Sequence, residues 1–230
     1  MDTTRPVLIF AGGEETPPGA LEALAADAFV IAADSGLTHA LAHGRAVDLV
    51  VGDLDSAPPR LVEAASAAGA VVERHPADKD QTDLALALDA AAALGARVVT
   101  VVGGHGGRLD HLFANLLLLG APRYAGLELD AVMGPARVVI VHDRRTLLGE
   151  PGELVSLLAL HGSAAGVSTE GLLFPLRDAV LAAGASLGVS NEFAAPQAQV
   201  TVERGCVAAV APGVRGVLWQ ARRQAGQHSE

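Results

Sequence analysis

The chain has 230 residues, of which 50% are hydrophobic but only 3% aromatic, and its 26 acidic and 16 basic side chains give a formal charge of −10. This length allows one large domain or two modest ones with an aliphatic core, and the composition is not that of a disordered chain. The negative charge and the lack of long Lys/Arg clusters exclude a typical nucleic-acid-binding protein. A nucleotide is still a possible ligand, provided that metal ions neutralise its phosphates.

A few residues restrict the cellular location and the covalent chemistry. The single cysteine, Cys206, excludes an internal disulfide and is typical of a reducing cytoplasm. Its surroundings, VERGCVAAV, indicate a turn followed by a buried strand rather than a nucleophile. The start of the chain lacks the basic and apolar regions of a secretion signal, and no apolar run approaches the ~18 residues of a membrane span. We therefore expect a cytoplasmic protein without a membrane partner.

The first half of the chain alternates strand-like and helix-like segments. Five short runs rich in Val and Ile have the length of buried strands: PVLIFA, FVIAA, VDLVVG, AVVERH and RVVTVVG. Helical patterns are predicted between and after them, at residues 18–27, 37–43, 58–69, 82–94 and 109–120. Such alternation favours a parallel sheet with helices on its faces, so we predict an α/β domain over residues 1–125.

The second half of the chain has a different pattern, in which no comparably strong helix recurs. After GAPRYAG, short apolar segments are separated by Gly, Pro and Asp: ELDAVMG, ARVVIVHD, ELVSLLAL, AQVTVERG and CVAAVAP. They predict an antiparallel β-sandwich or barrel over about residues 127–220, and we place the second domain at 126–222. LRDAVLAAG is predicted to form one or two helical turns, and the polar tail at the end of the chain to fray.

A polar cluster directly follows each predicted parallel strand. The clusters are AGGEE, ADSG, GDLDS, HPADKDQTD and GGHGGRLDH. In an open parallel sheet the carboxyl ends of all strands lie along one edge, and ligands bind in the crevice there. Clusters that are distant in sequence are therefore expected to meet in one place, where we predict the functional site.

Carboxylates dominate three of these clusters. Asp34 in ADSG has the simple alternative role of a helix N-cap. Asp53 and Asp55 in GDLDS have no basic residue beside them, and two nearby carboxylates repel by on the order of 1 kcal/mol unless a cation intervenes. In DKDQTD, Asp80 and Asp83 have the spacing of a capping box, which is the alternative there. We expect the pair in GDLDS to bind a metal ion.

Two clusters contain residues suited to phosphate. Lys79 is the only lysine among the 16 basic residues, and it is suited either to bind a phosphate oxygen or to pair with its neighbouring aspartates. GGHGGRLDH offers Gly104 and Arg108 at the start of a predicted helix, whose free N–H groups favour phosphate. The alternative for these glycines is a tight strand-to-helix turn. His39 and His43 share a helix face, but without a third ligand they indicate a solvated surface.

Several familiar active-site motifs are missing from the sequence. GGHGGR does not match the dinucleotide fingerprint G-x-G-x-x-G, and no G-x-x-x-x-G-K-[ST] loop occurs. There is also no H-E-x-x-H zinc motif and no G-x-S-x-G nucleophile elbow. The residues alone therefore indicate a carboxylate-rich crevice for a metal and a nucleotide, without a standard nucleotide-binding motif.

The motifs ADSG, GDLDS, KDQTD and GGRLDH, together with GVSNEF, resemble those of the thiamine pyrophosphokinase (thiamine diphosphokinase) family. They occur in the family's order and span residues 34–193, which is most of the chain. The resemblance implies a Mg²⁺-dependent enzyme that transfers a pyrophosphoryl group from ATP to the hydroxyl of thiamine, giving thiamine diphosphate and AMP. It also implies a nucleotide-binding α/β domain, a thiamine-binding β-sandwich domain and a homodimer.

The resemblance also assigns roles to individual residues. The implied Mg²⁺ ligands are Asp34, Asp53, Asp55 and Asp83. The implied catalytic residues are Asp55, Asp83 and Asp110, and the sequence does not choose a proton acceptor among them. Residues implied on the nucleotide side are Gly12, Gly13, Lys79, Gly104, Arg108 and His111. Residues implied on the thiamine side are Thr169, Ser190 and Asn191.

One position differs from the family's pattern, and the equivalence of a second position is not established by the sequence. Leu54 stands where the family commonly has an aromatic residue, a change expected to alter packing rather than chemistry. The family's vertebrate branch stacks the pyrimidine on a tryptophan, and the sequence does not establish that Trp219 is its equivalent.

Three other functions remain as alternatives. A related diphosphokinase would act on another alcohol, such as a hydroxymethylpterin, although GVSNEF in a β-rich segment favours thiamine. A sensor of magnesium nucleotide or thiamine would bind without forming AMP. A phosphohydrolase would release AMP or phosphate without an acceptor.

Overall fold

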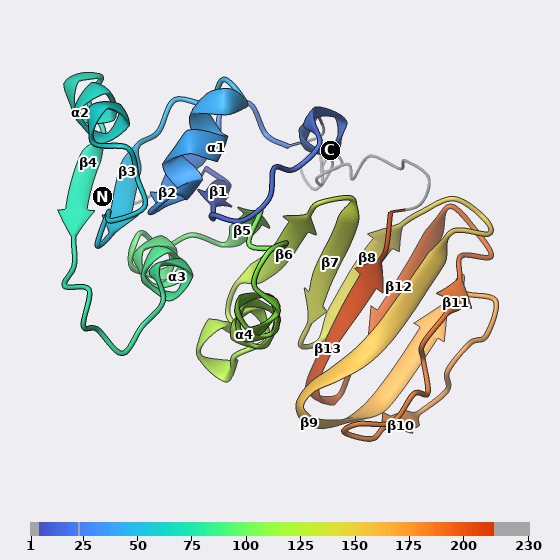
Figure 1. Ribbon diagram of the computed structural model, residues 1–230. Helices are drawn as coiled ribbons and strands as arrows, with labels where there is room; N and C mark the ends of the chain where they lie inside the picture. Colours follow the sequence, from blue (N-terminus) through green and yellow to red (C-terminus); the bar gives the residue numbers. More distant parts are fainter. Residues whose placement is uncertain (1–4, 23, 214–230) are drawn as a thin grey trace, which may run out of the picture.

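The protein is described by a computed structural model that covers residues 5–22 and 24–213, so Trp219 and the predicted frayed tail lie outside the described residues. Its strands form one continuous hydrogen-bonded sheet in the order β4-β3-β2-β1-β5-β6-β7-β13-β9-β12-β8, while β10 and β11 pair with β9. The sheet is parallel in the N-terminal part and antiparallel in the C-terminal part (Figure 1). The predicted fold class is confirmed.

Six strands form the parallel part of the sheet. They are β1 (Val7–Phe10), β2 (Phe29–Ala33), β3 (Leu49–Gly52), β4 (Val71–Arg74), β5 (Val98–Val102) and β6 (Glu128–Met133). The sequence pattern had suggested that ELDAVMG is antiparallel, but β6 runs parallel to β5 and only its other edge, against β7, is antiparallel. The connection from β5 to β6 contains a helix, and such a crossover is what parallel pairing requires.

Four α-helices connect these strands. They are α1 (Gly36–Ala42), α2 (Pro59–Ala67), α3 (Asp83–Ala93) and α4 (Leu109–Leu119). The described part of the chain also contains two 3₁₀ turns, η1 (Pro18–Leu21) and η2 (Pro122–Tyr124). The helix expected at 18–27 is only the short η1, in which Gly19 disfavours helix formation. Within residues 5–22 and 24–213, no helix has the length and apolar character needed to cross a bilayer.

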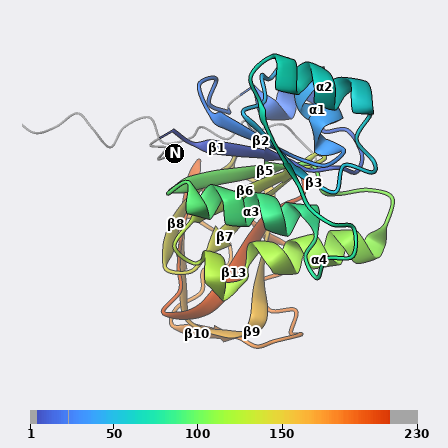
Figure 2. The same ribbon diagram turned by 90° about the vertical axis from the view of Figure 1, so that its left-hand side faces the viewer.

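The helices cover both faces of the parallel sheet. α1 and α2 lie on one face, and α3 and α4 lie on the other (Figures 1 and 2). In β1, Val7 and Ile9 pack into a cluster with α3, whereas Leu8 and Phe10 pack with Ala40 of α1. All four strand residues are at most 2% exposed. A strand buried on both faces has no position for a polar side chain until it ends, so the polar residues gather at its carboxyl end.

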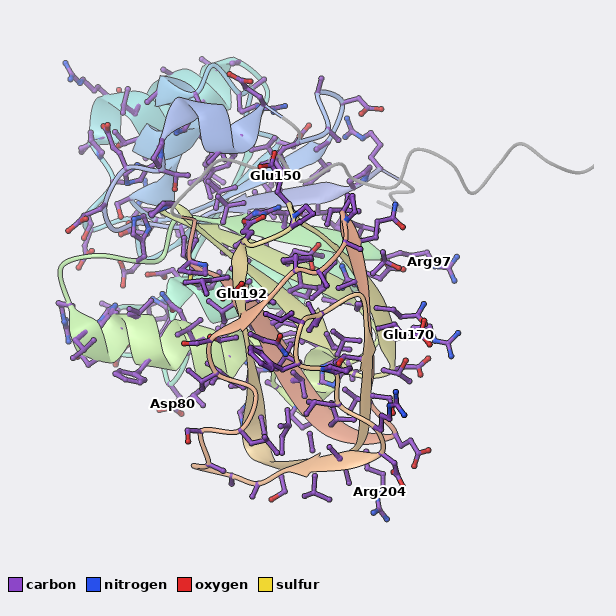
Figure 3. All side chains as sticks on the ribbon, turned by 90° about the vertical axis from the view of Figure 1, so that its right-hand side faces the viewer. Asp80, Arg97, Glu150, Glu170, Glu192 and Arg204 are labelled. Carbon is purple, nitrogen blue, oxygen red and sulfur yellow. The ribbon has the colours of Figure 1, made fainter. Side chains whose placement is uncertain are left out.

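The C-terminal part consists of antiparallel strands. They are β7 (Ala136–Val141), β8 (Arg144–Leu148), β9 (Leu154–Glu170), β10 (Ala179–Leu181), β11 (Asn191–Glu192), β12 (Gln197–Thr201) and β13 (Arg204–Ala211). LRDAVLAAG contains β10 instead of the predicted helical turns, because its apolar residues pair with β9 at Ala164 and Val167. Charged side chains such as Glu170 and Arg204 point outward from this part (Figure 3).

The long strand β9 takes part in two layers. Its residues 156–160 pair with β13, and residues 168–170 pair with β12. Between these stretches His161 and Gly162 have φ angles of 58° and 135°, which bend the strand. Aliphatic side chains, including Val141, Leu157 and Val200, fill the space between the layers. This packing is the predicted sandwich.

Candidate functional site

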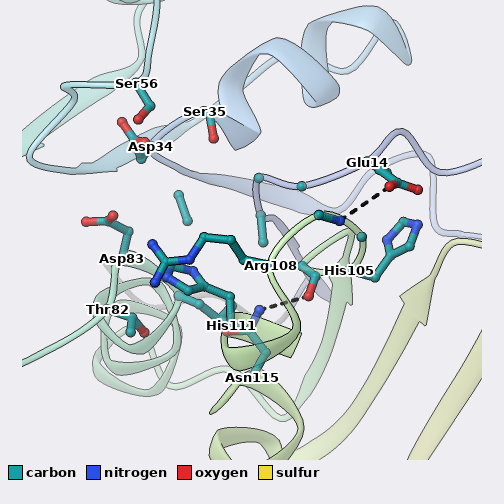
Figure 4. A pocket seen from close by; sticks show the side chains of 18 of the residues that line it. Glu14, Asp34, Ser35, Ser56, Thr82, Asp83, His105, Arg108, His111 and Asn115 are labelled. Atoms are coloured by element: carbon teal, nitrogen blue, oxygen red, sulfur yellow. Dashed lines mark hydrogen bonds between the residues drawn. The ribbon is translucent and has the colours of Figure 1, made fainter. Parts of the chain in front are cut away.

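A cavity of about 660 Å³ opens at the carboxyl ends of the parallel strands. Each of the five predicted polar clusters contributes at least one residue to its wall (Figure 4). The strand order reverses its direction between β1 and β5, and the loops after these two strands are part of the cavity. Ligands of open α/β sheets bind at such a reversal.

Three carboxylates converge at this edge of the sheet. One oxygen from each of Asp34, Asp53 and Asp83 lies within 4.8 Å of the other two. Asp34 is 8% exposed, and its Oδ1 has no hydrogen-bond partner among the described residues. Burial raises the pKa of Asp34 against the lowering effect of a hydrogen bond from the Ser35 backbone, and the charges of Asp83 and Asp53 raise it further. A cation beside the three groups would remove this penalty.

The backbone leaves room for the three carboxylates at Gly52. A Cβ on this glycine would lie 2.9 Å from Asp83 Oδ1 and 3.2 Å from Asp34 Cβ. Its φ of 145° is one that residues with side chains rarely adopt. The backbone N–H of Asp34 donates to Val51 O at 2.9 Å, which holds the end of β2 beside the end of β3. The ends of neighbouring strands therefore set the positions of Asp34 and Asp53, and the start of α3 brings Asp83 beside them.

The alternative roles as helix caps do not explain Asp34 and Asp83. The N-cap of α1 is Ser35, and no side-chain hydrogen bond caps that helix. The N-cap of α3 is Thr82, whose Oγ1 accepts from the backbone N–H of Ala85 at 3.3 Å. Hard carboxylate oxygens are the ligands that Mg²⁺ prefers, so the residues present fit a magnesium ion.

Asp55 lines the cavity but stands apart from the three gathered carboxylates. Leu54, with a φ of 63°, turns the chain between Asp53 and Asp55, and the backbone N–H of Asp55 donates to Asp53 Oδ1 at 3.2 Å. Ser56 Oγ donates to Asp55 Oδ1 at 2.9 Å. The side chain of Leu54 is 7% exposed and packs beside α2, which stabilises a conformation that leucine rarely adopts. Three of the four predicted ligands therefore lie together, and Asp55 lines the cavity outside this group.

Lys79 bridges two of the gathered carboxylates instead of lining the cavity. Its Nζ lies 3.0 Å from both Asp53 Oδ2 and Asp83 Oδ1, and its side chain is 13% exposed. Burial acts to lower the pKa of Lys79, but the hydrogen bonds to Asp53 and Asp83 outweigh it and the pKa is raised. The hydrogen bond from Lys79 is also the main reason that the pKa of Asp53 is lowered. Of the two roles considered for Lys79, this arrangement shows the ion pair.

Two glycine-containing loops form the opposite wall. In the loop at 103–107 all four glycines have φ between 58° and 91°, so side chains would be strained there. The backbone N–H of Gly104 donates to Gly12 O at 2.8 Å, and Asn115 Nδ2 donates to Gly104 O at 2.9 Å (Figure 4). These bonds fix the two loops against each other, and Gly12 and Gly13 present backbone directly to the cavity, as a phosphate site requires.

Two nitrogen-bearing side chains reach this wall from the start of α4. Arg108 and His111 line the cavity, whereas Asp110 does not. The Arg108 guanidinium, 70% exposed, donates to both oxygens of Asp110, at 2.6 and 3.2 Å. This pairing lowers the pKa of Asp110 to about 2. A carboxylate with so low a pKa is poorly suited to accept a proton near neutral pH.

None of the three predicted thiamine-side residues lines the cavity. Thr169 Oγ1 accepts from the backbone N–H of Leu176 at 2.8 Å. Asn191 Oδ1 accepts from the Phe174 N–H at 3.0 Å, and its Nδ2 donates to Phe174 O at 2.7 Å. Ser190 is exposed, with a φ of 57°. Two of these side chains therefore hold the segment between β9 and β10 in place.

Sequence reasoning missed several residues of the cavity wall. They are Glu14, Ser35, Ser56, Thr82, His105 and Asn115. Most lie inside the polar clusters that were singled out, but Asn115 does not. Its spacing of four residues from His111 puts both on one face of α4, and this was the available signal.

The fold and the site together define a class of protein: a two-part chain whose parallel sheet carries a carboxylate- and glycine-lined cavity and continues into an antiparallel sandwich. Two family models match the chain, "Thiamin pyrophosphokinase, catalytic domain" over residues 21–129 and "Thiamin pyrophosphokinase, vitamin B1 binding domain" over residues 141–207. The chain belongs to the thiamin pyrophosphokinase family, and it is an enzyme of that family.

Individual relatives agree with this assignment. Thiamine pyrophosphokinase from Bacillus subtilis (strain 168) is 27% identical over 152 residues, which are 62% of this chain and 67% of the relative. The crystal structure of the Bacillus subtilis enzyme, 22% identical, superposes with a TM-score of 0.78 over 90% of this chain and 98% of its own. That of thiamin pyrophosphokinase from Geobacillus thermodenitrificans, 27% identical, gives 0.74 over 90% and 96%. The Candida albicans enzyme shares the fold at 14% identity, with a TM-score of 0.73 over 90% and 88%.

Proposed function

We propose that this protein transfers a pyrophosphoryl group from MgATP to the hydroxyl of thiamine and releases thiamine diphosphate and AMP. The observation that carries the proposal is the convergence of Asp34, Asp53 and Asp83 beside a glycine-walled cavity, in a chain of this family. The match of residues 141–207 to the family's vitamin B1 binding domain supports thiamine as the acceptor. We assign nucleotide and metal binding to residues 1–125 and thiamine binding to 126–222, in a cytoplasmic enzyme.

The two walls of the cavity have different tasks in this reaction. The backbone N–H groups of Gly12 and Gly13 would bind the phosphates, while Gly104, whose own N–H donates to Gly12 O, would hold the two glycine loops together. Arg108 and His111 would contact the phosphates from the start of α4. Asp34, Asp53 and Asp83 would hold Mg²⁺, which when bound neutralises phosphate charge and orients the triphosphate. Most of the catalytic effect then comes from positioning and charge neutralisation.

Accepting the proton of the thiamine hydroxyl is the remaining task. Asp110 is the weakest of the three candidates, because its pairing with Arg108 lowers its pKa to about 2. Asp83 is already in contact with Lys79 at 3.0 Å. Asp55 is exposed on the cavity wall, and its side chain accepts a hydrogen bond from the hydroxyl of Ser56, while its backbone N–H donates to Asp53. We therefore favour Asp55 as the proton acceptor.

The proposed function is tested by incubating the purified protein with ATP and Mg²⁺, with and without thiamine, and separating the nucleotide and thiamine products. Equal amounts of AMP and thiamine diphosphate, formed only with thiamine and lost with EDTA, support it. AMP formed with a hydroxymethylpterin but not with thiamine would favour the related diphosphokinase. AMP or phosphate without an acceptor would indicate a hydrolase, and ligand binding without AMP would indicate a sensor.

Lys79→Ala is expected to weaken MgATP binding about tenfold and thiamine binding less than twofold, as measured by titration calorimetry. The substitution leaves Asp53 and Asp83 without the ammonium that now lies 3.0 Å from each, at the edge where the triphosphate would bind. Lys79→Arg, which keeps the charge, is the matched control and should lose less affinity. Equal losses for the two ligands would contradict the placement of Lys79 on the nucleotide side.

We further propose a homodimer in which the partner copy completes the thiamine site, because Thr169, Ser190 and Asn191 do not line the cavity of their own chain. Leu109 and Phe113, on the same helix α4 as the cavity residue His111, are apolar and exposed, as side chains covered by a second copy would be. Phe113→Glu is expected to give a monomer by light scattering and to lose most turnover. A wild-type protein that is monomeric at working concentration would contradict the dimer.

A further inference from the structure

A chain of side-chain hydrogen bonds joins the loop before α3 to the 3₁₀ turn that follows α4. Gln81 Nε2 donates to Asp89 Oδ2 at 2.8 Å, and Tyr124 OH donates to Asp89 Oδ1 at 2.7 Å. Tyr124 is 2% exposed, and its OH also lies 3.3 Å from Ala85 O. The Arg123 guanidinium lies over the Tyr124 ring, 4.8 Å from its centroid, and within 4.0 Å of Asp89. Asp89 therefore has a partner on each carboxylate oxygen.

The loop that Gln81 belongs to, residues 75–82, carries Lys79. This loop has no helix or strand of its own, so its backbone gains little order from local structure. The backbone N–H of His75 donates to Gly52 O at 2.9 Å at its start, and the Gln81 side chain is held at its end. Lys79 lies between these two attachments, two residues before Gln81. The position of the ammonium group thus depends on both of them.

The other end of the hydrogen-bonded chain reaches a second element of the cavity. Tyr124 ends η2, which directly follows α4 and precedes β6. α4 carries His111 and Asn115 of the cavity wall at its first turns. Asp89, on α3, thus connects the loop that carries Lys79 to the segment that follows α4 in the chain.

We propose that Gln81 and Asp89 are positioning residues for the reaction: the Gln81–Asp89–Tyr124 chain fixes the loop at 75–82 so that the Lys79 ammonium stays between Asp53 and Asp83. This inference rests on the proposed function for its kinetic consequences, although the geometry of the loop can be tested without it.

Loss of these hydrogen bonds is expected to affect stability and catalysis to different extents. The Asp89 side chain is 43% exposed, so water competes for its hydrogen bonds and their loss destabilises the fold little. A displacement of about 1 Å at a reacting group, in contrast, can slow a reaction about a hundredfold. A substitution in the chain should therefore affect nucleotide use more than it affects unfolding. Burial raises the pKa of Tyr124, so its hydroxyl remains a donor.

An exchange of the two functional groups provides the test. Gln81→Glu places a carboxylate where an amide now donates to Asp89 at 2.8 Å, and the two carboxylates repel each other. Asp89→Asn alone is the matched control: it keeps an acceptor for Tyr124, and the Gln81 amide can turn to accept from the new amide. The double variant Gln81→Glu/Asp89→Asn restores a donor and an acceptor with the original total charge. Hydrogen exchange of amides 75–82, KM values, kcat and thermal midpoints are measured for all four proteins.

For Gln81→Glu we expect amide exchange in 75–82 and the KM for MgATP each to rise about tenfold, with the thiamine KM within twofold and the thermal midpoint near that of the wild type. Asp89→Asn and the double variant should both stay within about twofold of the wild type. The inference is overturned if amide exchange in 75–82 remains fast in the double variant. It is also overturned if the thermal midpoint falls in each variant in which the KM for MgATP rises. A wild-type protein that forms no AMP would refute the proposed function instead, and the exchange rates would still decide the inference.

Discussion

Replacing Asp83 with asparagine is expected to slow thiamine diphosphate formation about a thousandfold, or roughly 4 kcal/mol in transition-state stabilisation. Asp83 is the first residue of α3, contributes an oxygen to the three-carboxylate cluster and lies 3.0 Å from Lys79 Nζ. Asparagine has the same shape without the charge, so the cluster loses a third of its negative charge and Lys79 loses a partner. Quantifying AMP and thiamine diphosphate at saturating substrates measures the effect.

Asp80→Asn is the matched control for this variant. Asp80 is exposed, lies three residues before Asp83 and is not part of the cluster, so the same chemical change should leave turnover within about twofold of the wild type. An acidic residue in the first turn of a helix stabilises it by about 0.3–1 kcal/mol, so Asp83→Asn should lower the thermal midpoint only slightly. Turnover of Asp83→Asn within tenfold of the wild type, in a folded protein, would contradict the assignment.

The parallel half of the fold could be predicted because its signals are local. A strand such as Val7–Phe10 is apolar throughout since both its faces are covered, and the polar residues come only after it. Where pairing depends on distant partners, the sequence pattern was insufficient. Nothing within Glu128–Met133 distinguishes a strand that pairs parallel on one edge from one that is antiparallel on both. The edge strand Ala179–Leu181 likewise exists because β9 extends far enough to pair with it.

The site could be predicted to the level of the cluster but not of each side chain. The rule that carboxyl ends of parallel strands meet correctly brought Asp34, Asp53 and Asp83 to one place. It could not separate Asp53 from Asp55, because their divergence depends on Leu54 adopting a φ of 63° to bury its side chain. The proposed role of Gln81 could not be predicted for a related reason. It depends on a hydrogen bond to Asp89, which lies eight residues later in α3.

The strand ends, rather than the loops, determine how close Asp34 and Asp53 come. The residues just before Asp34 and Asp53 are Ala33 and Gly52, the last residues of paired strands. Their register is fixed by the pairing of Ala33 with Val51 in the sheet. The spacing of the carboxylates is thereby part of the rigid core, which is the arrangement expected where a site must be preorganised before its ligands bind.

Gly52→Ala is therefore expected to have a large effect on both stability and activity. The added methyl group would lie 2.9 Å from Asp83 Oδ1 and 3.2 Å from Asp34 Cβ, on a backbone whose φ of 145° already disfavours any side chain. We expect the free energy of unfolding to fall by about 2–3 kcal/mol. Because relief requires the carboxylates to move apart, we also expect turnover to fall about a hundredfold. Urea unfolding followed by circular dichroism and the product assay measure the two effects.

Gly44→Ala separates backbone strain from crowding in this experiment. Gly44 has a φ of 67°, but a Cβ there would meet no heavy atom within 4 Å. Replacing Gly44 should therefore lower the free energy of unfolding by about 1–2 kcal/mol, because alanine is strained in the left-handed conformation, and should leave turnover unchanged. If Gly52→Ala kept wild-type turnover after a similar loss of stability, contact between the new methyl group and Asp83 would have no functional consequence. The spacing of the three carboxylates would then not be set at the end of β3.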